Sequence, residues 1–322
     1  MSKTPTRNIG LELVRATEAA ALASARWVGR GDKHLGDQAG VDGMRLLLNR
    51  MEMAGEIVVG EGEKDHAPML YVGESVGTGD GLRVDIAVDP VEGTNLLAKG
   101  LPNSLSVVGI STEGSMARLG SSFYMDKISV GPEGRDVVDL DQPLSANIRN
   151  LAKAKDVRVE EITVVALDRP RNEEKIASIR GSGARVRLIS DGDVSPSVMA
   201  ALPGTGIDMV VGIGGTPEGI ITACALRGLG GTIQGRLAPQ SDEERKRLEL
   251  EGVDLAKKYT AEDLVTGEEV FFAATAITEG DFLKGVRYTP RGPVTQSLVT
   301  RAKSGTWRIV ETHHLWEKTP TH

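Results

Sequence analysis

Residues 85–94, with the sequence DIAVDPVEGT, constrain the fold of this chain more than any other stretch. They begin as a short apolar run of the kind that a buried strand needs. A proline and a glycine then end the strand and shape a turn. Asp85, Asp89, Glu92 and Thr94 gather at this break. Polar residues that follow a buried strand are typical of a functional loop on a rigid scaffold.

A second acidic turn precedes this strand. Residues 60–63 have the sequence GEGE and directly follow the apolar run 57–59. Two strand ends that each present carboxylates can share a divalent cation, and Mg²⁺ and Mn²⁺ prefer oxygen ligands, often carboxylates together with substrate phosphate. The alternative, solvated turn acids, is less favoured because glycines beside the acids let a ligand approach closely. The candidate metal-binding acids are Asp37, Glu61, Asp89 and Glu92.

The composition limits the class of protein. The chain has 322 residues, of which 40% are hydrophobic and 26% charged, as is normal for a globular protein of one large domain or two lobes. The net charge of −7 argues against general nucleic-acid binding. It permits an anionic substrate, because bound metal and clustered arginines invert the local field. No secretory segment or membrane-spanning run is recognisable, so we expect a cytoplasmic protein without a membrane partner.

The first half of the chain predicts helices followed by a sheet. Apolar residues at helical spacing favour helices over about residues 9–28 and 38–54, after a loose arm at 1–8. Thr94 is placed to cap a short helix that ends near Lys99. The expected strands cover residues 104–111, 124–130 and 137–140. Their period of two indicates a largely antiparallel sheet.

After about residue 144 the pattern alternates between strand, loop and helix, which predicts a mostly parallel sheet with right-handed crossovers. We therefore expect one domain over residues 1–322, with two lobes that meet near 141–160. The expected strands at 162–167, 186–189 and 207–211 end in polar loops at 168–171, 191–193 and 212–219. Ligands bind at such strand ends. A charged helix at 242–258 and strands near 270–277, 283–288 and 294–312 complete the chain.

The loop at 212–219, GIGGTPEG, offers backbone N–H groups to an anion. Thr216 is placed to cap the next helix, and Gly215 directly precedes it. Glu218 falls in the first helical turn. It is either a functional acid or an acid that the helix dipole favours at this position.

The other two loops carry charge that suits a sugar phosphate. Arg169-Pro170-Arg171 is a rigid turn with two guanidinium groups, which match phosphate oxygens bidentately. The alternative is a solvated surface loop. The acids of Asp191-Gly192-Asp193 either accept hydrogen bonds from sugar hydroxyls or cap the next helix.

Seven motifs occur in order along the chain: RGDK, GEGEKDHAPMLY, DPVEGT, YMDK, DRPR, DGD and GIGGTPEG. Together, from about Ile9 past Gly280, they resemble class II fructose-1,6-bisphosphatases, within the lithium-sensitive, metal-dependent sugar phosphatases. The resemblance implies a layered αβαβα fold of the α/β (α+β) class and Mn²⁺ or Mg²⁺ as cofactor. It also implies gluconeogenic hydrolysis of the 1-phosphate of fructose 1,6-bisphosphate.

The resemblance also implies roles for single residues. It matches five metal ligands, Asp37, Glu61, Asp89, Glu92 and Glu218. It matches substrate contacts at Glu92, Gly93, Thr94, Tyr124, Arg169, Pro170, Arg171, Asp191, Gly192, Asp193 and Gly215. We predict that Glu61, Asp89 and Thr94 are catalytic, with the Thr94 hydroxyl orienting the attacking water. A homo-oligomer, dimer or tetramer, is expected from the resemblance alone.

Three alternatives remain open at this stage. Sedoheptulose 1,7-bisphosphate is a second substrate candidate, alone or alongside the fructose bisphosphate. Inositol monophosphate is less favoured, because Glu92 stands where inositol monophosphatases usually have Asp and because a second phosphate-binding turn would have no use. A sugar-phosphate sensor without turnover is the third alternative, and the intact set of acids argues against it.

Overall fold

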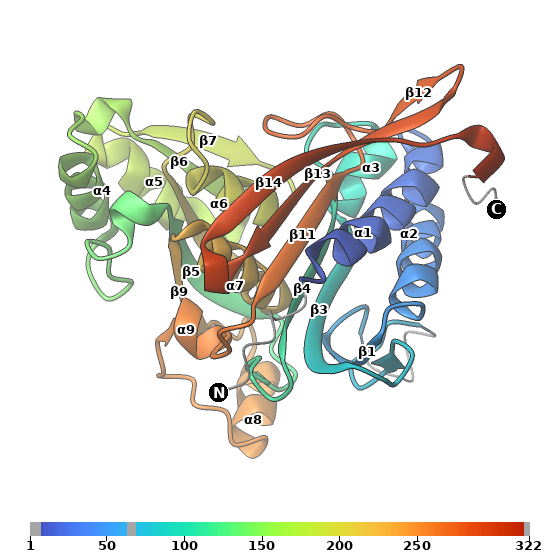
Figure 1. The fold of residues 1–322 in the computed structure, drawn as a ribbon. Helices are drawn as coiled ribbons and strands as arrows, with labels where there is room; N and C mark the ends of the chain where they lie inside the picture. Colours follow the sequence, from blue (N-terminus) through green and yellow to red (C-terminus); the bar gives the residue numbers. More distant parts are fainter. Residues whose placement is uncertain (1–7, 63–68, 319–322) are drawn as a thin grey trace.

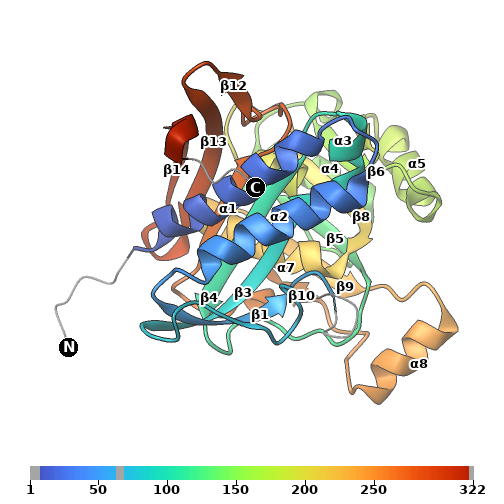
Figure 2. The same cartoon turned by 90° about the vertical axis from the view of Figure 1, so that its right-hand side faces the viewer.

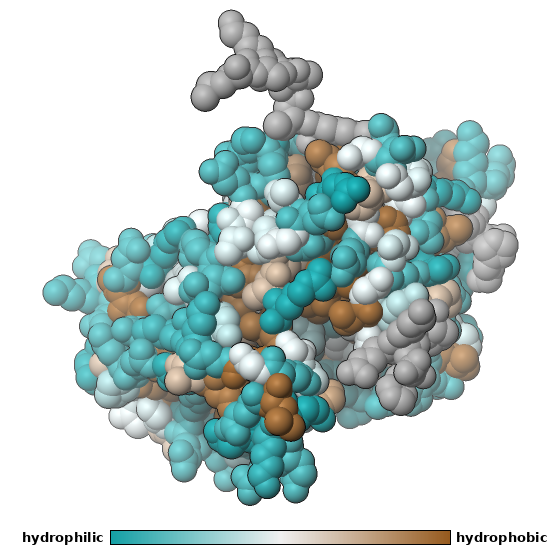
Figure 3. All heavy atoms as spheres, turned by 90° about the horizontal axis from the view of Figure 1, so that it is seen from below, coloured by the Kyte–Doolittle hydropathy of each residue, from teal (hydrophilic) through white to brown (hydrophobic). Residues whose placement is uncertain are grey.

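The computed structural model describes residues 8–62 and 69–318. The arm expected at 1–8 and the loop after the GEGE turn therefore lie almost entirely outside the described residues. Within the described part, no helix is long and apolar enough to cross a membrane. Seen from below, the surface is mostly hydrophilic, with apolar side chains scattered over it (Figure 3).

The larger sheet has eight strands in the order β12-β13-β11-β4-β3-β1-β2, with β14 on the outer side of β13 (Figure 1). Among these pairs only β1–β3 is parallel, so the expected antiparallel character of the first sheet is confirmed. Its strands are β1 (Met53–Val59), β2 (Ser75–Val76), β3 (Leu82–Glu92), β4 (Leu105–Thr112), β11 (Phe271–Ala276), β12 (Arg287–Thr289), β13 (Gly292–Arg301) and β14 (Thr306–His313).

The second sheet has six strands in the order β10-β9-β5-β8-β6-β7. They are β5 (Tyr124–Val130), β6 (Thr163–Leu167), β7 (Arg185–Ile189), β8 (Met209–Gly215), β9 (Thr232–Leu237) and β10 (Tyr259–Thr260). Strand β6 runs parallel to β7 and β8, but β5 is antiparallel to β8 and β9. The expectation of a mostly parallel second sheet was therefore wrong, because β5 belongs to this sheet and β9 was not foreseen.

Three helical layers alternate with the two sheets. Helices α1 (Gly10–Ser24) and α2 (Lys33–Leu48) cover the outer face of the first sheet, and they lie side by side in Figure 2. Helices α6 (Val194–Ala200) and α7 (Thr216–Leu229) fill the space between the sheets. Helices α4 (Leu144–Ala154) and α5 (Glu173–Ser182) cover the far side of the second sheet. The layered α/β fold is thus confirmed.

Strand β3 shows why a strand between two helical layers carries apolar side chains on both faces. Ile86 is buried in the core beneath α1 and α2, whereas its neighbour Ala87 is buried against α7. Alternate side chains of a strand point to opposite faces, so a strand between two helical layers reads as a continuous apolar run. Burying each large aliphatic side chain stabilises the fold by about 1.5–3 kcal/mol. This packing fixes the end of β3, where the acidic turn begins.

Several expected element boundaries differ in the structure. Residues 137–140 form turns, not a strand: Leu140 donates its N–H to the Gln234 side chain at 2.8 Å. Helix α2 begins at Lys33 because Asp32 caps it, and the helix expected to reach 258 is α8 (Asp242–Leu250). The strand expected at 294–312 is the hairpin β13–β14. The proposed lobe boundary near 141–160 stays a prediction.

Candidate active site

The break after β3 positions the first group of acids. The pairing of β3 with β4 shifts register between Asp89 and Glu92, which marks a bulge. Gly93 follows in the left-handed conformation with φ of 80°, which a glycine adopts without strain, and helix α3 (Thr94–Lys99) begins at once. The predicted turn is therefore present. Asp85 is not part of it, because this carboxylate is buried inside β3 and accepts the Met116 N–H at 2.9 Å.

Thr94 is the first residue of α3, and Gly93 is its N-cap. The helix has no side-chain cap hydrogen bond, so the expectation that Thr94 caps it was wrong. Thr94 instead lines the pocket that holds the acids. The catalytic role of its hydroxyl stays a prediction.

The acids meet in one cavity of about 290 Å³. Carboxylate oxygens of Asp89, Glu92 and Glu218 all lie within 4.8 Å of one another, a spacing that suits a metal ion. Asp37, from α2, and Glu61, from the turn after β1, line the same cavity. The Glu61 N–H donates to the Leu70 carbonyl at 3.0 Å, which fixes this turn. The structure thus brings together all five predicted metal-ligating residues.

Burial raises the pKa of each of these carboxyl groups, and neighbouring negative charges add to the rise at Glu61, Asp89 and Glu92. Burial, then the negative charge of Asp37, raises the pKa of Glu61 to about 8. Burial, then Glu61 and Glu218, holds the pKa of Asp89 well above its usual range. The pKa of Glu92 is raised in the same way by burial and by Asp89. Without a cation the cluster therefore keeps protons that a divalent ion would displace.

We expect the metal-free protein to lose stability as the pH rises. The Glu61 pKa is about 8 in the folded protein against an ordinary 4.5, so between these values the folded protein binds more protons than the unfolded chain. The stability contributed by the protonated group is complete below the unfolded pKa and is lost as the pH rises through the folded pKa. Since Mn²⁺ replaces these protons, its stabilising effect should grow over the same window. Thermal unfolding with chelator or with Mn²⁺, from about pH 5 to 9, measures both trends. A Mn²⁺-induced shift that is independent of pH would contradict the expectation.

A second cavity, of about 280 Å³, adjoins the first. The two share lining residues Glu92, Asp191, Pro217 and Glu218. The second is also lined by Tyr124, Arg169, Arg171, Gly192, Asp193 and Gly215. The predicted substrate contacts thus lie beside the predicted metal ligands, except Pro170, which does not line either cavity. Pro170 begins a short 3-10 helix (Pro170–Asn172) that contains Arg171 and has Arg169 as its N-cap.

The two arginines are held in place by backbone carbonyls. Arg171 donates through Nε to the Ile213 carbonyl at 3.0 Å, and its guanidinium lies 4.5 Å from the centre of the Tyr124 ring. Arg169 donates to the Ser190 carbonyl at 2.6 Å. Within the described residues, neither guanidinium forms an ion pair with a carboxylate. Two oriented, half-buried positive charges without a negative partner favour an anionic ligand such as phosphate.

Hydrogen bonds at Asp191 and an ion pair at Asp193 hold the loop 191–193 in place. Asp191 accepts from the backbone N–H and the side-chain amide of Asn95, at 3.2 and 3.0 Å. Asp193 forms an ion pair with Lys127, with 2.8 Å between Oδ2 and Nζ. Helix α6 has no side-chain cap hydrogen bond, so capping does not explain Asp193. Lys127 and Asn95 were missed from the sequence, although Lys127 ends the YMDK motif.

A glycine at the junction of β8 and α7 lets Glu218 fold back against the strand end. A Cβ on Gly215 would lie 1.7 Å from Glu218 Oε2, so a side chain here would move this carboxylate. Gly215 is the N-cap of α7, and Pro217 lies within its first turn. The expectation that Thr216 is the cap was wrong, because its hydroxyl instead lies 3.0 Å from the Ser122 hydroxyl.

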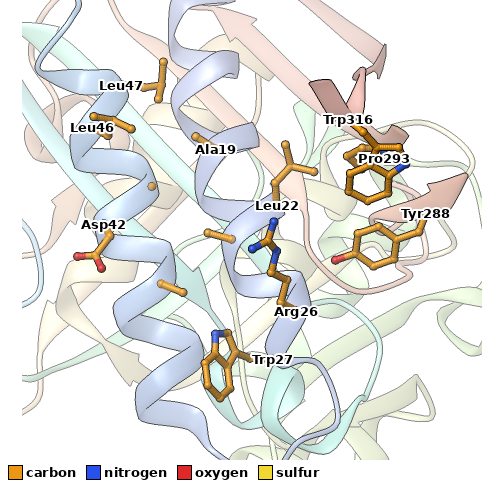
Figure 4. Close-up of a pocket in the computed structure, with 13 residues that line it drawn as sticks. Ala19, Leu22, Arg26, Trp27, Asp42, Leu46, Leu47, Tyr288, Pro293 and Trp316 are labelled. Atoms are coloured by element: carbon orange, nitrogen blue, oxygen red, sulfur yellow. The ribbon is translucent and has the colours of Figure 1, made fainter. Parts of the chain in front are cut away.

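A larger cavity, of about 320 Å³, lies elsewhere, between the outer sides of α1 and α2 and the C-terminal segment (Figure 4). Leu22, Trp27 and Leu46 face it from the helices, and Tyr288 and Trp316 stack against each other across from them. Asp42 is its single lining carboxylate among the described residues. This apolar cavity lacks the convergent acids that phosphoryl chemistry needs.

The chain was compared with known proteins. The family model of bacterial fructose-1,6-bisphosphatase, glpX-encoded, matches residues 7–314. The D-fructose 1,6-bisphosphatase class 2/sedoheptulose 1,7-bisphosphatase of Trichodesmium erythraeum is 43% identical over 338 residues, which cover 97% of this chain and 98% of that protein. A protein with the same name from Synechococcus sp. (strain JA-3-3Ab) is 43% identical over 332 residues, with 95% of each chain covered.

A solved structure, the extragenic suppressor protein suhB from Bartonella henselae, is 11% identical with a TM-score of 0.35 over 61% of this chain and 74% of that one. That similarity is too low to support an assignment. The family match and the two relatives extend over nearly the whole chain and agree with the motif resemblance. The chain therefore belongs to the family of bacterial, glpX-encoded fructose-1,6-bisphosphatases.

Proposed function

We propose that this protein hydrolyses the 1-phosphate of fructose 1,6-bisphosphate, giving fructose 6-phosphate and inorganic phosphate in gluconeogenesis. One observation carries the proposal: the cavity of carboxylates and the cavity of arginines share a wall formed by Glu92, Asp191, Pro217 and Glu218. In this proposal, a sugar with a phosphate at each end lies over these shared residues and reaches into both cavities. One phosphate then lies among the acids, and the other lies at Arg169 and Arg171.

The residues of the first cavity fit a divalent cation. All the candidate ligands, Asp37, Glu61, Asp89, Glu92 and Glu218, are carboxylates, which are the ligands that Mn²⁺ and Mg²⁺ prefer. Glu218 Oε2 is buried and has no hydrogen-bond partner within the described residues, as expected of an oxygen kept for a cation. When bound, such ions lower the pKa of water and neutralise charge on phosphate.

The protein's own contribution is to position the groups that react. The arginines hold the distal phosphate, and Tyr124 stacks under one of them and keeps its plane fixed. The Thr94 hydroxyl, two residues after Glu92, orients the attacking water. Phosphoryl transfer needs this positioning and charge neutralisation more than covalent chemistry by the protein.

We expect Thr94→Ala to lower kcat by about 10- to 100-fold with little change in KM, because the hydroxyl acts on the attacking water. Thr94→Ser should keep part of the rate, since it keeps the hydroxyl. Steady-state kinetics on fructose 1,6-bisphosphate measures both parameters. A change confined to KM would instead assign Thr94 to substrate binding.

Sedoheptulose 1,7-bisphosphate is the second candidate substrate. The two cyanobacterial relatives carry both activities in their names, and both substrates present two phosphates on one sugar. Inositol monophosphate would leave the arginine cavity without a ligand. A sensor without turnover would release no phosphate from any of these compounds.

Phosphate release from a panel of substrates tests the proposal. The panel contains fructose 1,6-bisphosphate, sedoheptulose 1,7-bisphosphate and inositol 1-phosphate, each with Mn²⁺, with Mg²⁺ and with excess chelator. We expect metal-dependent release from the bisphosphates and little from inositol 1-phosphate. Full activity in chelator, or release from inositol 1-phosphate alone, would overturn the proposal.

We further propose, from the motif resemblance, that the enzyme acts in the cytoplasm as a homo-oligomer, a dimer or a tetramer. Light scattering on the purified protein measures its mass in solution. A monomer at working concentration would contradict the oligomer.

A further inference from the structure

Lys127 lies beneath the candidate site with its charge buried. Its side chain is 8% exposed, as is the Asp193 side chain with which it forms an ion pair of 2.8 Å. Nζ also donates to the Gly215 carbonyl at 2.9 Å. Lysine is almost never buried unless it is paired, so this position has a specific structural reason.

The ammonium group joins three segments that are distant in the sequence. Lys127 belongs to β5, Asp193 ends the loop after β7, and Gly215 is the N-cap of α7. Glu218 lies three residues beyond Gly215, and its charge is close enough to Lys127 that the lysine opposes the rise in the Glu218 pKa caused by burial. One side chain therefore contacts both the loop at the second cavity and the helix start that carries a predicted metal ligand.

The end of β8 packs against the ion pair. A Cβ on Gly214 would lie 2.1 Å from Asp193 Oδ2 and 3.1 Å from Lys127 Cε, so a side chain here would displace the pair. The next residue, Gly215, accepts a hydrogen bond from Lys127 Nζ and begins the link to α7.

The carboxylate of Asp193 faces the lysine. Oδ2 is engaged by Lys127, and Oδ1 is buried without a hydrogen-bond partner within the described residues. Although Asp193 lines the second cavity, its side chain is only 8% exposed and Oδ2 already contacts Lys127. The contact that the structure shows for this carboxylate is therefore the ion pair, which links the loop to β5.

We propose that Lys127 is a positioning residue that locks the 191–193 loop and the start of α7 into one unit, and that Asp193 acts through Lys127 and not by binding the sugar with its carboxylate. The proposal deepens the function proposed above and rests on it for its kinetic part only. Its structural part concerns the rigidity of the 191–193 loop and the start of α7, and the affinity of the site for a cation.

Hydrogen exchange on the metal-free protein tests the structural part. The variants are Lys127→Met, Lys127→Arg and the double variant Lys127→Met/Asp193→Asn, which removes both buried charges and so keeps the fold if the single variant fails to fold. Lys155→Met is the matched control, because Lys155 forms a half-buried pair of 2.6 Å with Asp208, away from both cavities.

We expect faster exchange at residues 191–194 and 214–219 in Lys127→Met and in the double variant, partial protection in Lys127→Arg, and no change there in Lys155→Met. Calorimetric titration with Mn²⁺ alone should show an affinity about 10- to 100-fold weaker for Lys127→Met than for the control. Unchanged exchange in both segments together with unchanged Mn²⁺ affinity would overturn the proposal.

A kinetic double-mutant cycle of Lys127→Met, Asp193→Asn and the double variant tests the role of Asp193. If Asp193 acts through Lys127, the double variant loses no more kcat/KM than the worse single variant. Losses that multiply would show an independent contact of Asp193 with the substrate and overturn that part. If the wild type hydrolyses no sugar bisphosphate, the proposed function fails, whereas exchange and Mn²⁺ binding still decide the role of Lys127.

Discussion

We expect the Asp89→Asn protein to lose about a thousandfold or more of its phosphatase activity while it stays folded. Asp89 lies at the centre of the carboxylate cluster, and a neutral amide is a poorer partner for a hard cation. Metal assistance is worth several kcal/mol, and about 1.4 kcal/mol is a factor of ten in rate. Glu61→Gln should act in the same way. Steady-state phosphate release with saturating Mn²⁺ measures the loss.

Although Asp89→Asn should lower the activity, it should not lower the stability of the metal-free protein. Burial and neighbouring acids raise the Asp89 pKa, so the metal-free fold must either keep a proton on this carboxyl or bear a buried charge beside other acids, and asparagine removes that cost. The unfolding temperature in chelator should equal or exceed that of the wild type, and the Mn²⁺-induced rise should be lost. Asp85→Asn is the matched control, a buried acid of the same strand outside the cluster, and its activity should stay near that of the wild type. Equal losses in both variants would show a general effect on β3.

Arg169→Ala and Arg171→Ala should separate bisphosphatase from monophosphatase activity. Each removes charge-assisted hydrogen bonds worth roughly 1.5–3 kcal/mol, or about 10- to 150-fold in kcat/KM. The loss should be large for fructose 1,6-bisphosphate and small for fructose 1-phosphate, which has no distal phosphate. Lysine at either position should recover only part of the rate, because an ammonium makes no bidentate contact. The kcat/KM ratio of the two substrates is the measurement.

The loss of kcat/KM should differ in size between Arg169→Ala and Arg171→Ala. Arg171 donates to the Ile213 carbonyl and contacts the Tyr124 ring, whereas Arg169 donates to the Asp168 and Ser190 carbonyls and has no ring contact within the described residues. Arg180→Ala, an exposed arginine of the helix that follows, is the control and should leave both substrates unaffected. If both substrates lose activity equally, the turn serves the scissile phosphate or the fold. If neither does, the arginines are ordinary surface charges.

The local features of the site could be predicted because they depend on short stretches of sequence. A buried strand that bulges at its proline and ends before a glycine fixes the place of Asp89, Glu92 and Thr94; the strand runs through Pro90 to Glu92 and does not stop at the proline as expected. The loops at 168–171 and 191–193 follow β6 and β7, whereas the expected loop at 212–219 is the end of β8 and the start of α7. Because β6, β7 and β8 run in the same direction, all three stretches meet at one edge of the second sheet. Strand direction and loop position therefore placed most of the candidate residues.

Long-range pairing could not be predicted in this way. The alternation in β5 shows that it has a buried face but not that its neighbours are β8 and β9. Strand β9 was missed because glycine and polar residues interrupt it; its Gly235 packs where a Cβ would lie 2.1 Å from the Met125 sulfur. The cap predictions for Thr94 and Thr216 failed because each helix begins one residue earlier than its threonine suggests.

Contacts between segments that are distant in the chain also could not be predicted from the sequence. Lys127 meets Gly215 across 88 positions, and Asn95 meets Asp191 across 96. Neither contact leaves a periodic pattern in the chain. Such residues become visible only when the fold shows which charges are buried together.

The identity of the product shows which phosphate the enzyme removes. In the proposed function, one bisphosphate spans the two cavities with its 1-phosphate among the acids. Total phosphate and fructose 6-phosphate are measured together after wild-type enzyme, Mn²⁺ and fructose 1,6-bisphosphate have reacted and chelator has stopped the reaction. We expect equal amounts of the two products and none of either when chelator is present from the start. Fructose 1-phosphate as the product, or phosphate release that needs no metal, would contradict the proposed function.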